Sequence, residues 1–404
     1  MLLHLSDLSV ETFPLGASAD MSAARRSAVR KTPFMTVDLS APKKQLQRCT
    51  KCILPETMPF IEFDEQGVCS YCRRHQKIAY QGPEKLEELV EKYRSKRGQL
   101  DCLVLFSGGR DSSYTLHYVK KVLGMNPIAY SYDWGMMTDL GRRNQARMCG
   151  SLGIEHILVS ADIKQKRNYI RKNIQAWLRR PDLGMVPIFM AGDKQYFFYA
   201  NKIMKETGIK LAIMGDNPLE KSRFKQGFCG IDEGHRKVYD LPLWQKFQMA
   251  AYYGKQYFCN PAYINSSVLD TLFAFFSTYF TPHNYLDMFN YILWDEDEIN
   301  STLINTYDWE IAPDTSTTWR IGDGTAAFYN YIYYTIAGFT ENDAFRSNQI
   351  REGLITREDA LRLVEEENKP RFESLNWYAQ TIGFNLDEAL AIINGVPKLY
   401  EEQA

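Results

Sequence analysis

Short apolar runs alternate with longer amphipathic stretches between residues 101 and 215. The runs have the length of buried strands, and the stretches between them repeat apolar positions every three or four residues, as helices do. We expect strands at Cys102–Phe106, Ile128–Tyr132, His156–Val159 and Lys210–Met214, and helices at Ser112–Leu123, Thr138–Leu152, Ile163–Leu178 and Asp193–Thr207. This order requires crossover connections. It therefore predicts an α/β fold with a doubly wound parallel sheet and ligands at the carboxyl ends of the strands.

The flanking parts of the chain have a different pattern. A charged stretch, Glu84–Arg97, has helical spacing. Beyond about Leu241 the segments are aromatic-rich and show no strand alternation, which predicts helices at Trp244–Tyr257, Leu269–Leu293, Thr356–Asn368 and Leu386–Asn394. We expect four parts: a flexible extension (1–45), a cysteine unit (46–80), the α/β domain (81–240) and a helical C-terminal domain (241–404). A targeting peptide at the N-terminus is the weaker interpretation, because no unbroken apolar region precedes a cleavage signature.

Composition and charge narrow the class of protein. The chain has 404 residues, of which 45% are hydrophobic and 24% charged, as in ordinary globular proteins. Its 48 basic and 49 acidic residues leave a formal charge of −1, without the basic excess expected of a nucleic-acid or lipid-surface binder. No apolar run reaches the roughly 18–20 residues that span a bilayer. We expect a cytoplasmic protein without a membrane span or a nucleic-acid partner.

Four of the eight cysteines form two close pairs, Cys49-Thr-Lys-Cys52 and Cys69-Ser-Tyr-Cys72. This spacing is typical of zinc-ribbon sites, and four thiolates close a tetrahedron without leaving a position for water. We therefore predict a structural Zn²⁺ site. An iron–sulfur cluster would use the same ligands and stays an alternative.

The segment Ser107-Gly-Gly-Arg-Asp-Ser-Ser113 lies between a predicted strand and a predicted helix. Consecutive glycines allow a tight turn that aims backbone N–H groups at an anion, and the N-terminus of the helix adds a partial positive charge. The hydroxyls of Ser107, Ser112 and Ser113 can donate to phosphate oxygens. The lysine of a Walker loop is missing, which disfavours a kinase or a GTPase.

This segment resembles the SGGxDS loop of the PP-loop ATP pyrophosphatases, which grips the pyrophosphate that leaves ATP. Several further segments take part in a wider resemblance: the cysteine unit, Gly215-Asp-Asn217, Trp319-Arg-Ile-Gly-Asp-Gly-Thr325, Phe339–Asp343 and Arg346–Arg351. With them, roughly residues 46–395 resemble the N-acetyl sugar amidotransferase family. The resemblance implies an enzyme of surface-polysaccharide biosynthesis that adenylates a carboxyl or acetamido oxygen of a nucleotide-linked sugar and releases pyrophosphate. Ammonia from a separate glutaminase subunit then replaces AMP.

Site residues follow from the motifs and from this resemblance. For ATP and Mg²⁺ we expect Phe106, Ser107, Gly108, Gly109, Arg110, Asp111, Ser112, Ser113, Asp133, Gly215 and Asp216. Asp111 and Asp216 are the candidate catalytic residues, because their carboxylates can hold the metal ion. For an anionic acceptor in the C-terminal domain we expect Arg320, Asp323, Thr325, Arg346 and Arg351. An Arg–Asp pair that braces a turn would explain Arg320 and Asp323 equally.

Alternatives remain for other residues and for the activity. The charged run Glu220, Lys221, Arg223 and Lys225 either folds over the triphosphate or forms a solvated surface. The second candidate activity is that of a PP-loop sulfurtransferase, in which a persulfide on Cys149 or Cys229 attacks an adenylated tRNA base or small molecule. A nucleotide-binding scaffold without catalytic activity is a third. Activity that survives Cys229→Ser would favour the amidotransferase.

Overall fold

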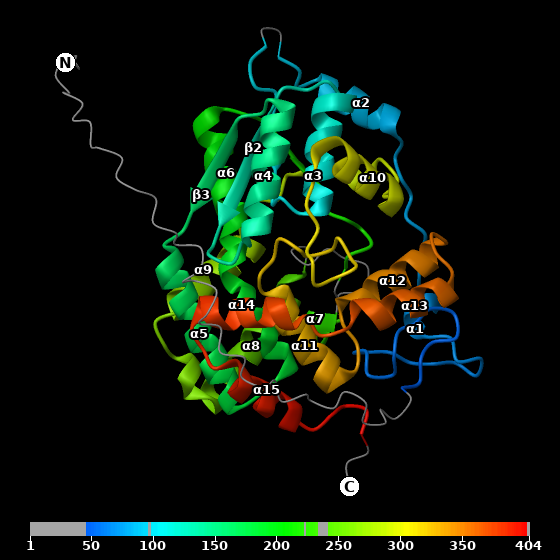
Figure 1. Cartoon of the computed structure of the whole chain (residues 1–404), viewed down its shortest axis with the longest axis vertical. Helices are drawn as coiled ribbons and strands as arrows, with labels where there is room; N and C mark the ends of the chain where they lie inside the picture. The colour runs from blue at the N-terminus through cyan, green and yellow to red at the C-terminus, as the bar shows by residue number, and fades with distance from the viewer. Residues whose placement is uncertain (1–45, 96–97, 222–223, 233–240, 402–404) are drawn as a thin grey trace, which may run out of the picture. The chain divides into compact units, whose positions relative to one another are not determined.

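The computed structural model describes residues 46–95, 98–221, 224–232 and 241–401 (Figure 1). The extension predicted for residues 1–45 and Arg223 of the charged run lie outside these ranges. A five-stranded parallel sheet has the strand order β3-β2-β1-β4-β5. The strands are β1 (Cys102–Leu105), β2 (Pro127–Asp133), β3 (His156–Ser160), β4 (Leu211–Met214) and β5 (Leu286–Asp287). The predicted α/β class and all four predicted strands are confirmed, with ends that shift by no more than one residue.

Helices cover both faces of the sheet. They are α3 (Arg110–His117, continued by a π-helical turn at Tyr118–Val122), α4 (Asp139–Leu152), α5 (Ile163–Arg179) and α6 (Tyr196–Thr207, preceded by a 3₁₀ segment, Leu183–Gln195). Successive strand side chains point to opposite faces. Cys102 and Val104 therefore pack with residues of α3 and α4, whereas Leu103 and Leu105 pack with residues of α6.

The first strand is approached through two short helices. These are α1 (Ser70–Arg73), inside the cysteine unit, and α2 (Pro83–Glu91), which has proline at its first position. Proline suits that position because the N–H it lacks would have no partner inside the helix. The helix predicted for Glu84–Arg97 is therefore confirmed over its first part.

The rest of the chain is mostly helical. Its helices are α7 (Phe224–Gly227), α8 (Leu243–Cys259), α9 (Val268–Tyr279), α10 (Glu296–Tyr307), α11 (Ala326–Ala337), α12 (Glu341–Glu352), α13 (Arg357–Glu367), α14 (Phe372–Ile382) and α15 (Leu386–Gly395). The prediction of one helix over Leu269–Leu293 is wrong in its second half. The helix ends at Tyr279, because Pro282 offers no N–H donor and disfavours helical geometry in the residue before it. The chain then forms β5, which pairs with Ile213 and Met214 of β4.

The described residues form one compact unit. Trp294, Trp319 and Phe345 of the C-terminal part share a hydrophobic core with Val104 and Phe106 at the first strand. The domain boundaries expected at residues 80 and 240 stay predictions. Within the described ranges, no helix is long and apolar enough to cross a membrane.

Candidate functional site

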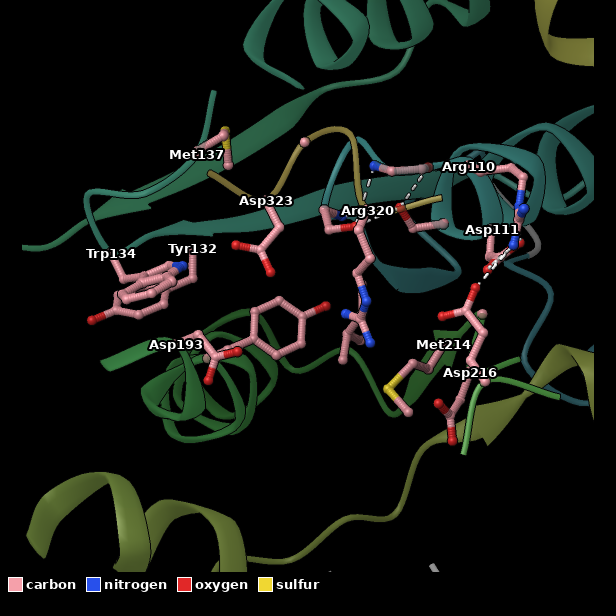
Figure 2. Close-up of a pocket in the computed structure, with 18 of the residues that line it drawn as sticks. Arg110, Asp111, Tyr132, Trp134, Met137, Asp193, Met214, Asp216, Arg320 and Asp323 are labelled. Atoms are coloured by element: carbon pink, nitrogen blue, oxygen red, sulfur yellow. Dashed lines mark hydrogen bonds and ion pairs between the residues drawn. The ribbon is translucent and has the colours of Figure 1, made fainter. Parts of the chain in front are cut away.

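A cavity of about 340 Å³ lies at the carboxyl ends of β1, β2 and β4 (Figure 2). Its wall combines the glycine loop after β1 with segments that follow β2 and β4, the start of α6 and residues 319–323. The predicted site residues that line it are Ser107, Gly109, Arg110, Asp111, Ser112, Gly215, Asp216, Arg320 and Asp323. Two regions that lie far apart in the sequence therefore meet in one cavity.

The glycine loop turns directly into α3. Gly108 has a φ of +80°, and a Cβ atom at this residue would lie 2.8 Å from the backbone oxygen of Gly141, so only glycine fits. The hydroxyls of Ser107 and Ser112 lie 2.9 Å apart across the turn. No side chain of the described residues caps α3, whose N-cap is Gly109. The N–H groups of its first turn are therefore available to an anion in the cavity.

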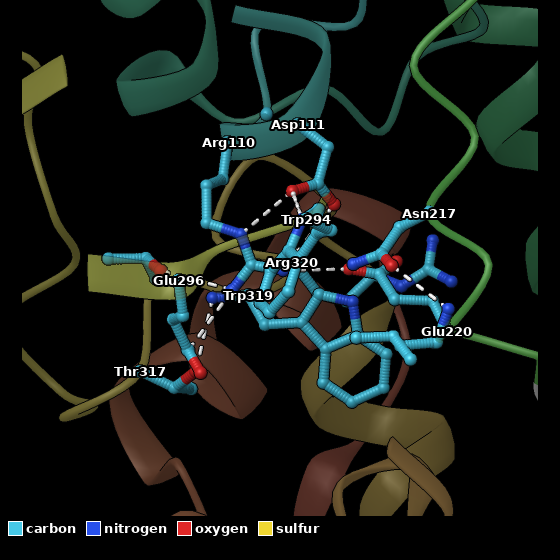
Figure 3. A network of polar contacts seen from close by, with 12 residues as sticks. Arg110, Asp111, Asn217, Glu220, Trp294, Glu296, Thr317, Trp319 and Arg320 are labelled. Carbon is cyan, nitrogen blue, oxygen red and sulfur yellow. Dashed lines mark hydrogen bonds and ion pairs between the residues drawn. The ribbon is translucent and has the colours of Figure 1, made fainter. Parts of the chain in front are cut away.

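Arg110 belongs to the wall, but its guanidinium group is directed toward three carboxylates of the protein (Figure 3). Its nitrogens lie 3.0 Å from Asp111, 2.9 Å from Glu220 and 3.3 Å from Glu296. The guanidinium carbon also lies 4.7 Å from the centre of the Trp294 ring. Only 1% of the side chain is exposed. The group expected to contact phosphate therefore holds carboxylates in place.

Asp111 and Glu220 form a pair of carboxyl groups with opposite pKa shifts. Burial disfavours ionisation of Asp111, but the Arg110 guanidinium outweighs burial and lowers the pKa of Asp111. Trp294 Nε1 also donates to Asp111 Oδ1 at 2.8 Å. Burial, followed by the neighbouring Asp111 carboxylate, raises the pKa of Glu220 to about 8. Asp111 is therefore the more readily ionised carboxyl group of the pair.

Glu220 is a cavity residue that the sequence singled out only as part of a charged run. The signal that could have identified it is its place five residues beyond the strand-end glycine, Gly215. A Cβ atom on Gly215 would lie 2.2 Å from Thr115 Oγ1, so glycine alone lets this segment pass α3. The segment then carries Asp216 to the exposed edge of the cavity and Glu220 to Arg110.

The C-terminal run reaches the cavity by pairing with the loop after β2. Met137 and Asp323 form an antiparallel bridge, and the N–H of Gly324 donates to the carbonyl of Met136 at 2.9 Å. Arg320 lies between two groups of residues in Figure 2, with Asp111 and Asp216 on one side and Trp134 and Asp193 on the other. The cavity therefore has a loop end and an aromatic end, separated by a cation.

Arg320 carries two marks of a functional residue. Its φ of +55° is left-handed, a backbone conformation that a non-glycine residue adopts at a cost of about 1–3 kcal/mol. Its buried Nε has no hydrogen-bond partner among the described residues. Burial disfavours the charge, but Glu341 outweighs burial, and the pKa of Arg320 is raised above its ordinary value. Arg320 therefore stays charged and keeps a donor for a ligand.

The aromatic end of the cavity was missed by sequence reasoning. Tyr132 lies near the end of β2 and Trp134 directly follows it, and Tyr196 and Phe197 begin α6. Burial raises the pKa of Asp193, whose Oδ1 has no partner among the described residues. Tyr132 and Trp134 flank the predicted residue Asp133, and this was the only sequence signal for the aromatic end.

Several predicted site residues lie outside the cavity. Asp133 is buried, accepts a hydrogen bond from the N–H of Gly135 and pairs with Arg142. Asp133 therefore caps the turn that follows β2. Phe106 and Ser113 are fully buried, and Gly108 forms the turn behind Gly109. Strand and helix periodicity directs their side chains into the core rather than toward the ligand.

Three predicted acceptor residues also lie elsewhere. Thr325 donates its hydroxyl to Asp323 at 2.6 Å and so braces the C-terminal run. Arg346 is buried on α12 and forms ion pairs with Glu296 and Glu367. Arg351, 1.4 turns further along α12, lies beside Cys72 instead of the cavity. Of the five predicted acceptor residues, Arg320 and Asp323 are the two that line the cavity.

The four cysteines of the predicted zinc site come together in a second site. Their sulfur atoms all lie within 4.8 Å of one another, and all four residues are buried. The Sγ–Sγ distances are 3.9 Å for Cys49–Cys72 and 3.7 Å for Cys52–Cys69. A Zn–S bond of about 2.3 Å gives tetrahedral S–S edges of roughly 3.8 Å, whereas a disulfide needs about 2.05 Å. The cluster can therefore hold a metal ion such as zinc.

The cysteine unit is anchored to the C-terminal helices. Arg357 Nε donates to the carbonyl oxygens of Cys49 and Cys52, and Arg48 pairs with Asp343 at 2.7 Å. In Figure 1 the segment around α1 lies against α12 and α13. None of the four cysteines lines the cavity described above. These contacts indicate a structural site.

Comparison with known proteins assigns no function. No family model matches the chain. Over 222 residues, the chain is 22% identical to an uncharacterised protein of Methanocaldococcus jannaschii, an alignment that covers 51% of this chain and 76% of that protein. The functional argument therefore rests on the motifs and on the geometry of the cavity.

Proposed function

We propose that the protein is an ATP-dependent amidotransferase of the PP-loop pyrophosphatase type, related to the N-acetyl sugar amidotransferases. This proposal rests on one observation. The glycine loop, which leads into the uncapped N-terminus of α3, and Arg320 line the same cavity. A ligase that transfers AMP must hold the α-phosphate of ATP next to the acceptor oxygen. It needs hydrogen-bond donors for the β- and γ-phosphates and a cation near the α-phosphate.

In this proposal, ATP binds along the cavity, with its phosphates at the loop end and its base at the aromatic end. The β- and γ-phosphates of ATP bind at the loop end, on the N–H groups of the first turn of α3 and the hydroxyls of Ser107 and Ser112. The base binds at the aromatic end, against Tyr132 or Trp134. This places the α-phosphate near Arg320, whose unpartnered Nε donates to it or to the acceptor oxygen as negative charge develops.

Mg²⁺ fits the loop end by the chemistry of its ligands. Asp111, Asp216 and Glu220 supply carboxylate oxygens, which this cation prefers. Bound there, Mg²⁺ would neutralise charge on the departing pyrophosphate. Glu220 would hold the metal ion in its ionised form. Arg110 keeps Asp111 ionised and in position.

The reaction needs no nucleophilic side chain. An oxygen of the acceptor attacks the α-phosphorus, the bond to the β-phosphate oxygen breaks, and pyrophosphate leaves. Ammonia then attacks the activated carbon and AMP leaves with the oxygen that carried it. We propose a nucleotide-linked sugar as acceptor and a separate glutaminase subunit as the source of ammonia.

The positions of two cysteines favour this activity over sulfur transfer. Cys229 lines a different, apolar cavity, and burial raises the pKa of its thiol to about 12. Cys149 lies buried on α4, and burial raises its pKa to about 12 as well. A persulfide carrier must reach the adenylated carbon and form a thiolate easily. Neither cysteine meets these conditions.

The products test the proposal. The chain with ATP, Mg²⁺, ammonium chloride and a panel of nucleotide-linked amino sugars should release AMP and pyrophosphate, which ion-exchange chromatography separates from ADP. ADP and phosphate as products would contradict the proposed mechanism. AMP release that is lost in Cys229→Ser would instead support sulfur transfer.

A matched pair of variants tests the role of Arg320. Arg320→Ala should lower AMP release about ten- to hundredfold, as expected for loss of a charge-assisted contact to an anion, while the fold remains intact. Arg346→Ala removes an arginine that lies outside the cavity and should lower thermal stability first. If both variants lose stability and activity in equal proportion, Arg320 is a structural residue.

A further inference from the structure

Two helices that border one cavity, α8 and α9, carry a large apolar surface that no other part of the described chain covers. Its exposed side chains are Leu243, Trp244, Phe247 and Phe258 of α8, Leu269, Leu272 and Phe276 of α9, and Phe280 directly after α9. Trp244 is 75% exposed and Phe258 86%. At roughly 150–250 Å² per aromatic side chain, this α8–α9 face presents on the order of 1,000 Å² of apolar surface. Soluble monomers expose patches of about 300–600 Å².

Five of the exposed residues of α8 form a regular stripe. Trp244, Phe247, Ala251, Gly254 and Phe258 are spaced by three and four residues in alternation, and all five are exposed. This is the spacing of the a and d positions at a helix–helix contact. The buried residues of α8, Met249 and Gln256, lie on the opposite side of the helix. The helix therefore has a core-facing side and a second apolar side that is open.

We propose that the α8–α9 face is the interface of a homodimer, in which α8 packs antiparallel against α8 of a second copy across a two-fold axis at Ala251. Around that axis, Trp244 lies level with Phe258 of the second copy, and Phe247 lies level with Lys255, one residue from Gly254. Large side chains therefore meet at the two ends, and small ones allow close approach in the middle. A two-fold interface pairs one surface with a second copy of itself, and the stripe meets this requirement at Trp244, Ala251 and Phe258, with Phe247 and Gly254 offset by one residue.

A cavity beside the stripe supplies the hole that this packing needs. It has a volume of about 410 Å³, lies between α8, α9 and the 3₁₀ segment, and includes Ala250, Gly254 and Leu272 in its wall. Phe247 of the second copy lies beside Gly254 and enters there. The apolar area also matches the roughly 800 Å² per partner of a stable protein interface.

The charges of α8 disfavour a lipid surface as the occupant. Helices that lie on membranes carry many lysines and arginines on their polar side. α8 has two, Lys246 and Lys255, and Lys246 donates to the carbonyl of Tyr279 at 2.7 Å. These observations favour a second copy over a membrane.

The mass of the full chain in solution is the first test. Sedimentation velocity from 1 to 50 μM should give twice the 46.8 kDa of one chain. Gly254→Phe fills the hole, and nothing lies within 4 Å of the added Cβ, so the fold accepts the change. This variant should weaken dimerisation about tenfold or more. Gly150→Phe is the matched control, because Gly150 is also exposed in a helix with nothing within 4 Å, and it should remain dimeric.

Cross-linking tests the position of the axis. In a Cys259→Ser background, which removes the exposed cysteine of the described residues, Ala251→Cys should form a covalent dimer under copper–phenanthroline oxidation. Gly150→Cys should not. A monomer at 50 μM, a dimer unaffected by Gly254→Phe, or no cross-link at position 251 would each overturn the proposal. A monomer that co-sediments with anionic phospholipid vesicles would show that the face binds membranes instead.

Discussion

Replacement of Arg110 separates a structural role of this residue from a role in nucleotide binding. The sequence placed Arg110 in the phosphate-binding loop, whereas its guanidinium lies among Asp111, Glu220 and Glu296 with 1% of the side chain exposed. Arg110→Met keeps the length and the apolar contacts of the side chain but removes its charge. Three carboxylates then lose a shared partner.

The expected loss of stability follows from this geometry. Breaking a buried ion pair by removing one partner costs about 3–5 kcal/mol, because an uncompensated charge stays behind. Glu296 retains Arg346 at 2.6 Å, so the loss falls mainly on Asp111 and Glu220. With an unfolding entropy of roughly 2.1 cal/mol/K per residue over about 350 residues, Tm should fall by about 4–7 °C.

The loss should also depend on pH. Arg110 helps to lower the pKa of Asp111 and, behind Arg346, that of Glu296. A carboxyl group with a lowered pKa stabilises the fold above its unfolded-state pKa and loses this contribution as the pH falls through its folded-state value. The difference in Tm between the wild type and Arg110→Met should therefore be largest near pH 7 and shrink toward pH 3.

Differential scanning calorimetry measures the change in Tm, and nucleotide titration measures the change in ATP affinity. Together they show whether Arg110 stabilises the fold or binds the nucleotide. Arg143→Met is the control, because Arg143 also pairs with a carboxylate, Glu310, but is 53% exposed, and its Tm should stay unchanged. If Arg110→Met left Tm unchanged and abolished ATP binding, the guanidinium would serve the nucleotide, and the argument from burial would be refuted.

Three further predictions concern the metal, the loop and the carboxyl pair. Metal analysis should find about one zinc per chain, and Cys52→Ser should lower both zinc content and Tm while ATP binding persists; absence of both zinc and iron would contradict the metal site. Gly109→Ala should weaken ATP binding in titration calorimetry with little change in Tm, because Gly109 lines the cavity and its nearest contact would be 3.3 Å away. Gly108→Ala should instead lower Tm through its positive φ and its contact with backbone, and equal effects of the two variants would count against the proposed loop geometry. Because the pKa of Glu220 is raised from 4.5 to about 8, the wild type should lose stability as the pH rises between these values, and Glu220→Gln should remove that loss in thermal melts. Identical pH profiles of the two proteins would show that Glu220 titrates normally.

The sequence determined the local elements and the chemistry of the short motifs. Apolar runs of strand length predicted β1 to β4, and the pairs around Cys49 and Cys69 predicted four thiolates in one place. Both are local: a strand needs its own run of apolar residues, and each cysteine pair needs only a short turn. The position of the glycine loop at a strand end likewise followed from neighbouring residues.

Tertiary structure alone decided which distant residues share a site. The bridge between Met137 and Asp323 brings Arg320 to the glycine loop, whereas Arg346 and Arg351, close to Arg320 in sequence, turn into the core and toward Cys72. On a helix, positions a few residues apart point to different sides, so proximity in sequence does not give a common direction.

The same reason explains Arg110, β5 and the aromatic end of the cavity. Arg110 belongs to the loop motif, but the carboxylates that neutralise it come from positions 220 and 296. Leu286–Asp287 is too short to be recognised as a strand and forms one only because β4 offers an open edge. Tyr132 and Trp134 belong to no motif and gain a role from the residues that the fold places around them. Such pairings depend on long-range packing, which no local pattern in the sequence encodes.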